Sequence, residues 1–278
     1  MVSICKKSSW ALLGCLGMAG WTGIAQAAPV VITTTVNFSA LDGGNRDTDG
    51  CVNGIFTADA LTVRSVGAII LDTAEARFAI HGDVLIENSG AIRNHSIIPL
   101  DAGPALTIST FGNFTMKNDG LIRSHGRMRG GRIILMVLGN LELTQRAKIE
   151  AHNAALTVVG GSIEITTHGT IRLVNSTNRV TANGISGGLV TLCSGSPACP
   201  AIYLNSVVNA VGHKGMGGQV NIRAEDGGIS VVGQIFRIAA SGTEGNGTVT
   251  FFADTTVSPN PPMTNPPATV NTLGNPCP

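Results

Sequence analysis

The sequence is poor in aromatic and charged side chains. Aromatic residues make up 4% of the 278 residues and charged residues 13%, whereas 36 residues are glycine. Long amphipathic helices need a charged solvent face, so this composition suits them poorly. It favours short alternating strands joined by many tight turns, and the 43% share of hydrophobic residues is ample for a continuous core.

The chain also lacks net charge. It carries 18 Lys and Arg against 17 Asp and Glu, and loss of Lys6 and Lys7 with an N-terminal leader would leave 18 − 2 = 16 basic residues. No overall field would draw such a protein to nucleic acid or to a membrane surface. Aromatic side chains do not interleave with basic ones, which further argues against nucleic acid.

The first 27 residues predict an export signal. Lys6 and Lys7 precede an apolar, uncharged run from residue 10 to residue 24, and Ala25-Gln26-Ala27 has the small residues that signal peptidase requires. We therefore expect a mature chain from Ala28 that is secreted or held at the cell surface, with no integral membrane segment. A rival interpretation makes Cys15 the lipidated residue of a lipoprotein box.

Cysteines with zinc-ligand spacing, such as CxxC, are missing. Cys51, Cys193, Cys199 and Cys277 follow the leader, and an even number in an exported protein favours disulfides. Cys193 and Cys199 flank a turn-rich insertion, so we expect a local Cys193–Cys199 bond. The pairing of Cys51 and Cys277 stays open, including a bond from Cys277 to another chain.

A repeat of 27 to 30 residues runs through the chain. Each copy holds three short apolar segments separated by turns, and periods of this length are typical of solenoids. The first segment begins at Phe78, Leu106, Ile133, Ile163, Val190, Val220 and Val249. The second begins at Leu61, Val84, Phe114, Leu141, Ile171, Ile202 and Ile229. The third is marked by Ile69, Ile92, Ile122, Ile149, Val180, Val211 and Ile238.

These repeats predict an all-β fold, a right-handed parallel β-helix of about seven three-strand coils. We expect residues 1–27 to be the signal peptide, 28–53 an N-terminal cap, 54–257 the β-helix and 258–278 a proline-rich tail. Glycines at the corners should supply positive φ angles. The prolines after Ser258 should prevent the tail from extending a parallel ladder.

The repeat elements GG-x-I-x-I, G-N-h-x-h and G-x-I, where h is hydrophobic, resemble those of the glycine-rich β-helical exoproteins of bacteria. That group includes filamentous-haemagglutinin-like adhesins and autotransporter passengers, and the resemblance covers about residues 36 to 252. It implies a secreted, adhesin-like role. The Asn-Pro-Asn motifs of two-partner secretion domains and an autotransporter barrel are missing, which counts against a haemagglutinin-type role.

Catalysis is not expected, although many β-helices degrade polysaccharides. Such enzymes need clustered carboxylates on the outer face of the coil. Here Glu142 has Thr115 and Arg172 as its expected neighbours, and Glu164 lies between Ile134 and Thr191. The Asn-Thr-Asp and Gly-His-Gly signatures of polygalacturonases are not found. A polysaccharide lyase or glycoside hydrolase-like enzyme remains the alternative function.

Three histidines recur three residues after the third apolar position, as His95, His125 and His152. They should stack at one corner, and Asn183 and Ser241 continue the column. One interpretation is a structural ladder of polar side chains. The other is a weak metal site or a pH-sensitive patch, because imidazoles one ladder spacing apart can share an ion.

The same coils are rich in basic residues. Between Arg93 and Lys148 there are eight Lys or Arg residues against three acids. Arg93, Arg123, Arg127, Arg129 and Arg132 could therefore hold an acidic polysaccharide or another anion of the cell surface. The alternative is that these arginines only keep a long rod soluble.

The segment Asn45-Arg46-Asp47-Thr48-Asp49-Gly50 copies the first half of a calcium-binding loop. Asn45, Asp47 and Asp49 would supply the oxygen ligands. The twelfth position of the full motif requires Glu and is Phe56 here, so a plain turn is the other interpretation. Apart from this possible calcium ion we expect no cofactor.

Overall fold

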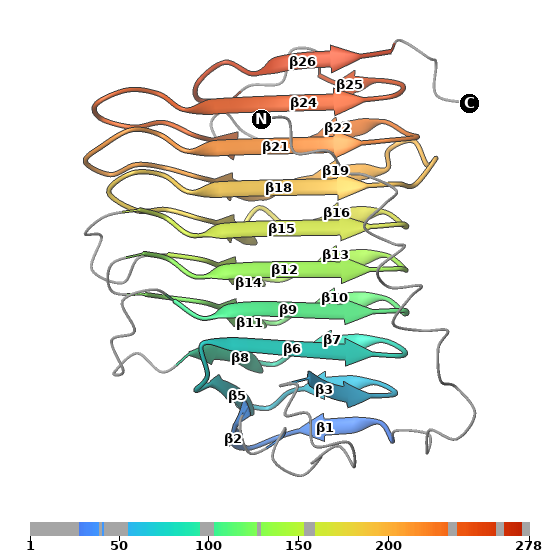
Figure 1. Cartoon of the computed structure of the whole chain (residues 1–278). Coiled ribbons are helices and arrows are strands. Elements are labelled where there is room, and N and C mark those ends of the chain that lie inside the picture. The colour runs from blue at the N-terminus through green and yellow to red at the C-terminus, as the bar shows by residue number, and fades with distance from the viewer. Residues whose placement is uncertain are drawn as a thin grey trace.

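A computed structural model describes residues 28–38, 41, 55–94, 103–126, 129–152, 159–232, 238–259 and 264–273. These residues form 26 strands, wound into one stack of coils (Figure 1). Every strand pairs in parallel with its equivalents in the neighbouring coils. The expectation of an all-β parallel solenoid of about seven coils is therefore confirmed.

Three parallel sheets make up the stack, with nine, eight and nine strands. Sheet A holds β1 (Val30–Ile32), β4 (Leu61–Val63), β7 (Val84–Ile86), β10 (Phe114–Met116), β13 (Leu141–Leu143), β16 (Ile171–Leu173), β19 (Ile202–Leu204), β22 (Ile229–Val231) and β25 (Val257–Ser258). Sheet B holds β2 (Thr35–Asn37), β5 (Ala68–Leu71), β8 (Ala91–Asn94), β11 (Leu121–Arg123), β14 (Lys148–Glu150), β17 (Arg179–Thr181), β20 (Val207–Asn209) and β23 (Ile238–Ala239). Sheet C holds β3 (Ile55–Ala58), β6 (Glu75–Ile80), β9 (Ala105–Thr110), β12 (Arg132–Val137), β15 (Ser162–Thr167), β18 (Leu189–Ser194), β21 (Gln219–Ala224), β24 (Thr248–Ala253) and β26 (Thr269–Thr272).

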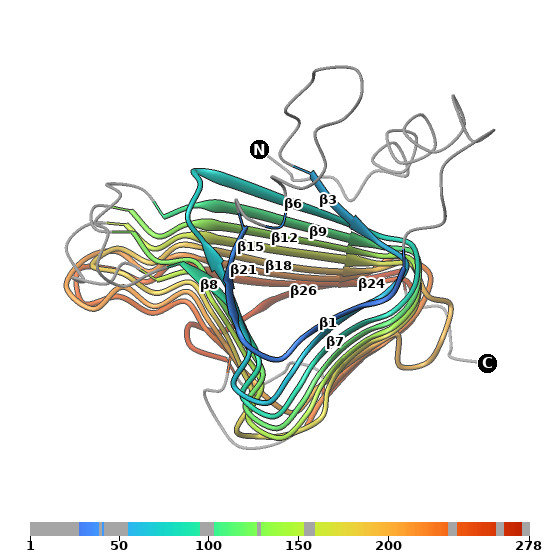
Figure 2. The same ribbon diagram turned by 90° about the horizontal axis from the view of Figure 1, so that it is seen from below.

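The coil is right-handed. Figure 2 looks along the stack from its N-terminal end, and the chain passes from β6 to β7 to β8 clockwise as it recedes. The cross-section is roughly triangular, and the loops between sheets B and C project from one corner. Right-handedness is the usual preference of parallel crossovers, so this expectation is also confirmed.

The predicted inward columns are correct except at two positions. Phe78 pairs with Ile108, and the residue beside Leu106 is Ala76. The shift by two residues keeps Phe78 on the inner face, so alternation alone could not reveal it. In the coil that carries the cysteines, Val208 rather than Val211 lies between Val180 and Ile238.

One continuous apolar core fills the coil. Inward side chains such as Phe114, Leu141 and Ile171 are fully buried, and each such side chain contributes about 1.5–3 kcal/mol on folding. Near the N-terminal end the ring of Phe78 contacts Phe38 at 5.0 Å and Phe56 at 5.6 Å between centroids. These three aromatic rings fill the core of the first coils.

The turns from sheet C to sheet A carry a ladder of side-chain hydrogen bonds. Asp83 Oδ1 accepts from the backbone N–H of Asn113 at 2.7 Å. Asn113 Oδ1 accepts from Asn140 N at 3.0 Å, and Asn140 Oδ1 accepts from Thr170 N at 2.8 Å. Each polar side chain thus satisfies a backbone donor of the next coil, which explains the Gly-Asp and Gly-Asn pairs at these turns.

Positive φ angles occur at residues other than glycine, in the turns from sheet A to sheet B. The residues are Ser65, Val66, Asn88, Ser89, Asn118, Asp119, Gln145 and Arg146, with φ between 50° and 69°. The described glycines other than Gly126 have φ angles outside the left-handed region. The expectation that corner glycines supply positive φ is therefore wrong for these residues.

The double glycines have a different role, in the loops from sheet B to sheet C. There the outgoing and returning limbs of one loop approach each other, and Gly161 N donates to Ala151 O at 2.9 Å. Gly188 and Gly218 make the same bond within their own loops at 2.8 Å, as does Gly247, which follows Asn246 and not a glycine. A Cβ at Gly161 would lie 2.8 Å from that carbonyl oxygen, so only glycine fits.

The ladder extends further at both ends than we expected. Strands β1 and β2 pair with β4 and β5, so residues 30–37 belong to the first coil, while residues 42–54 lie outside the described part of the chain. Strand β26 pairs in parallel with β24 although it follows several prolines. The expectation that the proline-rich segment cannot extend a parallel ladder is therefore wrong. Among the described residues, no helix combines the length and apolar character needed to span a bilayer.

Candidate functional site

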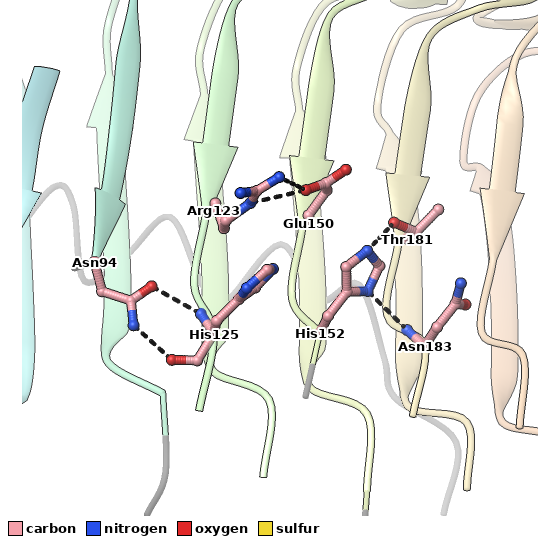
Figure 3. Close-up of polar contacts among 7 residues, drawn as sticks. All are labelled: Asn94, Arg123, His125, Glu150, His152, Thr181 and Asn183. Atoms are coloured by element: carbon pink, nitrogen blue, oxygen red, sulfur yellow. Dashed lines mark hydrogen bonds and ion pairs between the residues drawn. The ribbon is translucent and has the colours of Figure 1, made fainter. Parts of the chain in front are cut away.

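The column of histidines lies at the base of the B–C loops. His125 follows β11 and His152 follows β14, and Asn183 holds the equivalent place after β17 (Figure 3). His152 Nδ1 accepts from the backbone N–H of Asn183 at 3.3 Å, and Asn183 Oδ1 accepts from Val211 N at 2.9 Å. His152 thus holds its neighbouring coil as an asparagine does, which supports the structural-ladder interpretation for this residue.

In the coil before His125, the side chain that bonds to the next coil is Asn94, one residue before the position equivalent to His125. Asn94 Oδ1 accepts from the backbone N–H of His125 at 2.9 Å, and Asn94 Nδ2 donates to His125 O at 2.6 Å. The backbone of His125 is therefore fixed by Asn94, the last residue of β8. The predicted partner His95 lies outside the described residues, so a stack of three histidines stays a prediction.

An ion pair lies beside the two histidines and joins the last residues of β11 and β14 (Figure 3). Arg123 and Glu150 are neighbours in the parallel register. The Arg123 guanidinium donates to Glu150 Oε2 through Nε at 2.9 Å and through Nη2 at 2.6 Å. The Glu150 side chain is only 9% exposed, so this pairing offsets the cost of burying a carboxylate.

The backbone of His125 forms hydrogen bonds with Asn94, but its ring lacks a hydrogen-bond partner at one nitrogen. Its ring lies 5.4 Å from the ring of His152, measured between centroids. Its Nε2 atom is buried and has no hydrogen-bond partner. Such an atom is costly to bury, and in native proteins it calls for an explanation such as an ion or a ligand.

Electrostatics keep the cluster in one protonation state at neutral pH. Burial lowers the pKa of His125 to about 4, and Arg123 and His152 act in the same direction. Burial also lowers the pKa of His152, against the opposing effect of Glu150. Burial alone would raise the pKa of Glu150, but Arg123 outweighs it, so the pKa of this carboxyl falls below its usual value. Two neutral imidazoles therefore lie beside one carboxylate.

This set of side chains could coordinate a metal ion. One ligand atom from each of His125, Glu150 and His152 lies within 4.8 Å of the other two. Glu150 is not among the residues predicted from the sequence, although it follows Ile149 as Arg123 follows Ile122. Placing the two residues side by side in the repeat would have shown the opposite charges on adjacent coils.

The arginines predicted to bind an anion lie on different sheets, and only some of them contact a carboxylate. Arg93 and Arg129 are exposed, and no carboxylate pairs with either in the described part of the chain. Arg132 begins β12 on sheet C, and its side chain is 61% exposed and 3.8 Å from Glu164. Arg127 lies outside the described residues.

Acids from adjacent turns and coils reduce the basic character that a count along the chain suggests. Glu87 pairs with Lys117 at 3.1 Å and Asp119 with Arg146 at 2.6 Å. Together with the Arg123–Glu150 and Arg132–Glu164 contacts, these pairs leave three of the described basic residues between Arg93 and Lys148 without a carboxylate partner in the described part of the chain: Arg93, Arg129 and Lys148. The positive surface is therefore narrower than predicted, and Arg93 and Arg129 are its unpaired residues next to the B–C loops.

Other predicted sites receive no test from the structure. The calcium ligands Asn45, Asp47 and Asp49 lie outside the described residues. Cys193 is buried on β18 and Cys199 follows in the same coil, and their disulfide stays a prediction. Cys51 and Cys277 are also outside the described residues.

The expected surroundings of the two isolated carboxylates are confirmed. Glu142 pairs with Thr115 and Arg172. Glu164 pairs with Ile134 and Thr191. Neither has a second carboxylate beside it in the sheet, whereas glycosidases act through two such groups.

Comparison of the chain with protein-family models, with curated proteins and with solved structures gives no match.

Proposed function

We propose that the chain is an exported, non-catalytic binding protein whose solenoid holds acidic glycans or similar anions of a cell surface. The proposal includes membership of the bacterial β-helical exoproteins, which the parallel solenoid and the leader-like residues 1–27 support. The observation that carries the ligand class is the pair of exposed arginines at the B–C corner.

Arg93 and Arg129 are suited to bind an anion because both are exposed and no carboxylate in the described part of the chain pairs with their guanidinium groups. Arg93 lies on β8, next to Arg123 in the register, and Arg129 lies on the returning limb of the loop that Arg123 begins. They therefore occupy neighbouring coils on the same corner. A planar guanidinium forms two parallel hydrogen bonds with a carboxylate or sulfate, which a polymer of uronate or sulfated sugars repeats along its length.

The solenoid suits a polymeric ligand because its outer surface is regular. Equivalent residues of adjacent coils are about 4.8 Å apart, so groups on successive coils form a straight row. Arg132, 61% exposed at the start of β12, extends the positive surface onto sheet C. Rows of donors on a rigid rod lose little conformational entropy when an extended chain binds.

Retention on a column of sulfated or uronate polysaccharide tests the proposal. We expect the mature protein to elute at a salt concentration that falls when Arg93 and Arg129 are both changed to Gln, because each lost contact weakens binding by about 0.5–1 kcal/mol. Arg146→Gln is the matched control: this arginine is also exposed but is paired with Asp119 at 2.6 Å on another corner.

Equal retention of the double variant and the wild type would refute the assignment to this corner. Release of new reducing ends or unsaturated sugars from the same polysaccharides would instead favour the enzymatic alternative.

A further inference from the structure

We propose that His125, Glu150 and His152 form a binding site for a first-row transition-metal ion such as Zn²⁺. The site is independent of the glycan proposal, because it uses none of the arginines assigned to the anion. Two imidazoles and one carboxylate are a ligand set that such ions favour, and Ca²⁺ and Mg²⁺, which prefer oxygen, do not.

The first argument is convergence. The three side chains come from two adjacent coils, and the parallel register of β11 and β14 places them side by side. Their nearest ligand atoms lie within 4.8 Å of one another, so shifts of about an ångström would bring each within the roughly 2.1 Å that zinc requires. A buried Glu150 and two half-buried histidines leave the ion a path from solvent.

The second argument is the unsatisfied Nε2 atom of His125. It is buried and has no hydrogen-bond partner, and the ring that carries it lies 5.4 Å from the His152 ring, measured between centroids. Asn94 fixes the backbone of His125 by two hydrogen bonds, so the ring is held at the cluster. A metal ion would satisfy this nitrogen, which no other group in the described chain does.

The protonation state also suits the ion. Neutral imidazoles and an ionised carboxylate carry lone pairs that can coordinate an ion without first losing a proton, so little proton release is needed at neutral pH.

Two existing contacts oppose binding and predict moderate affinity. His152 Nε2 lies 3.1 Å from Thr181 Oγ1, and His152 Nδ1 accepts from Asn183 N. Coordination through Nε2 moves the ring proton to Nδ1, so the bond from Asn183 N–H is lost, at a cost of about tenfold in affinity. Arg123 must also give up part of its contact with Glu150. We therefore expect a dissociation constant on the order of micromolar.

Zinc titration by calorimetry of the full mature chain at neutral pH tests the site. We expect one site in the wild type and at least about tenfold weaker binding in His125→Asn, His152→Asn and Glu150→Gln. His168→Asn is the matched control, because His168 lies at the turn between sheets C and A. Arg123→Met should tighten binding about threefold or more, since it removes the cation that competes for Glu150.

Two further measurements keep the test decisive if a variant folds poorly. Far-UV circular dichroism identifies such variants, and electron paramagnetic resonance of Cu²⁺ bound to the wild type should show coupling to two nitrogens. Absence of binding at millimolar zinc would overturn the proposal. So would binding that survives in both His125→Asn and Glu150→Gln, or weaker binding in a folded Arg123→Met variant.

Discussion

The double glycines make a quantitative prediction at Gly161. In the Gly161→Ala variant the added Cβ would lie 2.8 Å from Ala151 O and 2.9 Å from Ala151 Cβ, and closer still to Gly131 O. Two of these three atoms belong to backbone carbonyls, so no side-chain rotation can relieve the contact. Overpacking of this kind costs about 1–3 kcal/mol. If the limbs separate, the hydrogen bond from Gly161 N to Ala151 O is lost as well, which adds about 1 kcal/mol.

The expected loss in free energy of unfolding is therefore about 2–4 kcal/mol. Gly195→Ala is the matched control, because the nearest atoms to its added Cβ are Thr167 O at 3.7 Å and His168 Cα at 3.9 Å. That change should be neutral or stabilise by about 0.4–1 kcal/mol through the unfolded chain.

Urea unfolding followed by far-UV circular dichroism measures both variants. A Gly161→Ala protein that unfolds at the same urea concentration as Gly195→Ala would show that the two limbs of the loop do not meet as closely as described.

Two further predictions concern a turn and the histidine cluster. Val66 is 77% exposed and has φ of 62°, a conformation that costs a β-branched residue about 1–2 kcal/mol. Val66→Asn should therefore raise the melting temperature of the protein. An unchanged or lower melting temperature would contradict the described turn. In metal-free protein, the His125 pKa of about 4 lies below the ordinary 6.5, so the unfolded state binds more protons between these values. Stability should therefore fall as pH decreases through this window, by about 1–2 kcal/mol between pH 7 and pH 5 after allowance for partial exposure. His125→Asn should flatten this part of the profile of urea midpoint against pH, and an unchanged slope would show that His125 is not the group responsible.

The fold could be predicted because period and alternation are properties of the chain itself. The column from Leu61 to Ile229 is correct throughout, since every copy of the second segment has an apolar residue at the same place. The first column failed at Phe78, where Ala76 is the true equivalent of Leu106. Positions two apart share a face, so hydrophobicity cannot distinguish them when the spacing between coils varies.

The candidate site was predicted in part. The histidine spacing pointed to the correct corner, but the role of Glu150 depends on which residues become neighbours across coils. A count of charges along the chain treated Arg123 as free, whereas the register brings Glu150 to within 2.6 Å of it. The role of the corner glycines was predicted wrongly for a similar reason, because the approach of the two limbs of a loop is visible only in three dimensions.

The hydrogen bonds of the side-chain ladder at the C–A turns all run the same way along the solenoid. At the C–A turns, Asp83, Asn113 and Asn140 each accept from a backbone N–H of the following coil. A coil that forms after its predecessor finds its acceptor already in place, whereas a coil that forms before it must leave a donor to water. The two ends of the stack are thus chemically different. Growth of the solenoid from its N-terminal side, in the order of synthesis, would therefore find a side-chain acceptor in place at each of these three turns.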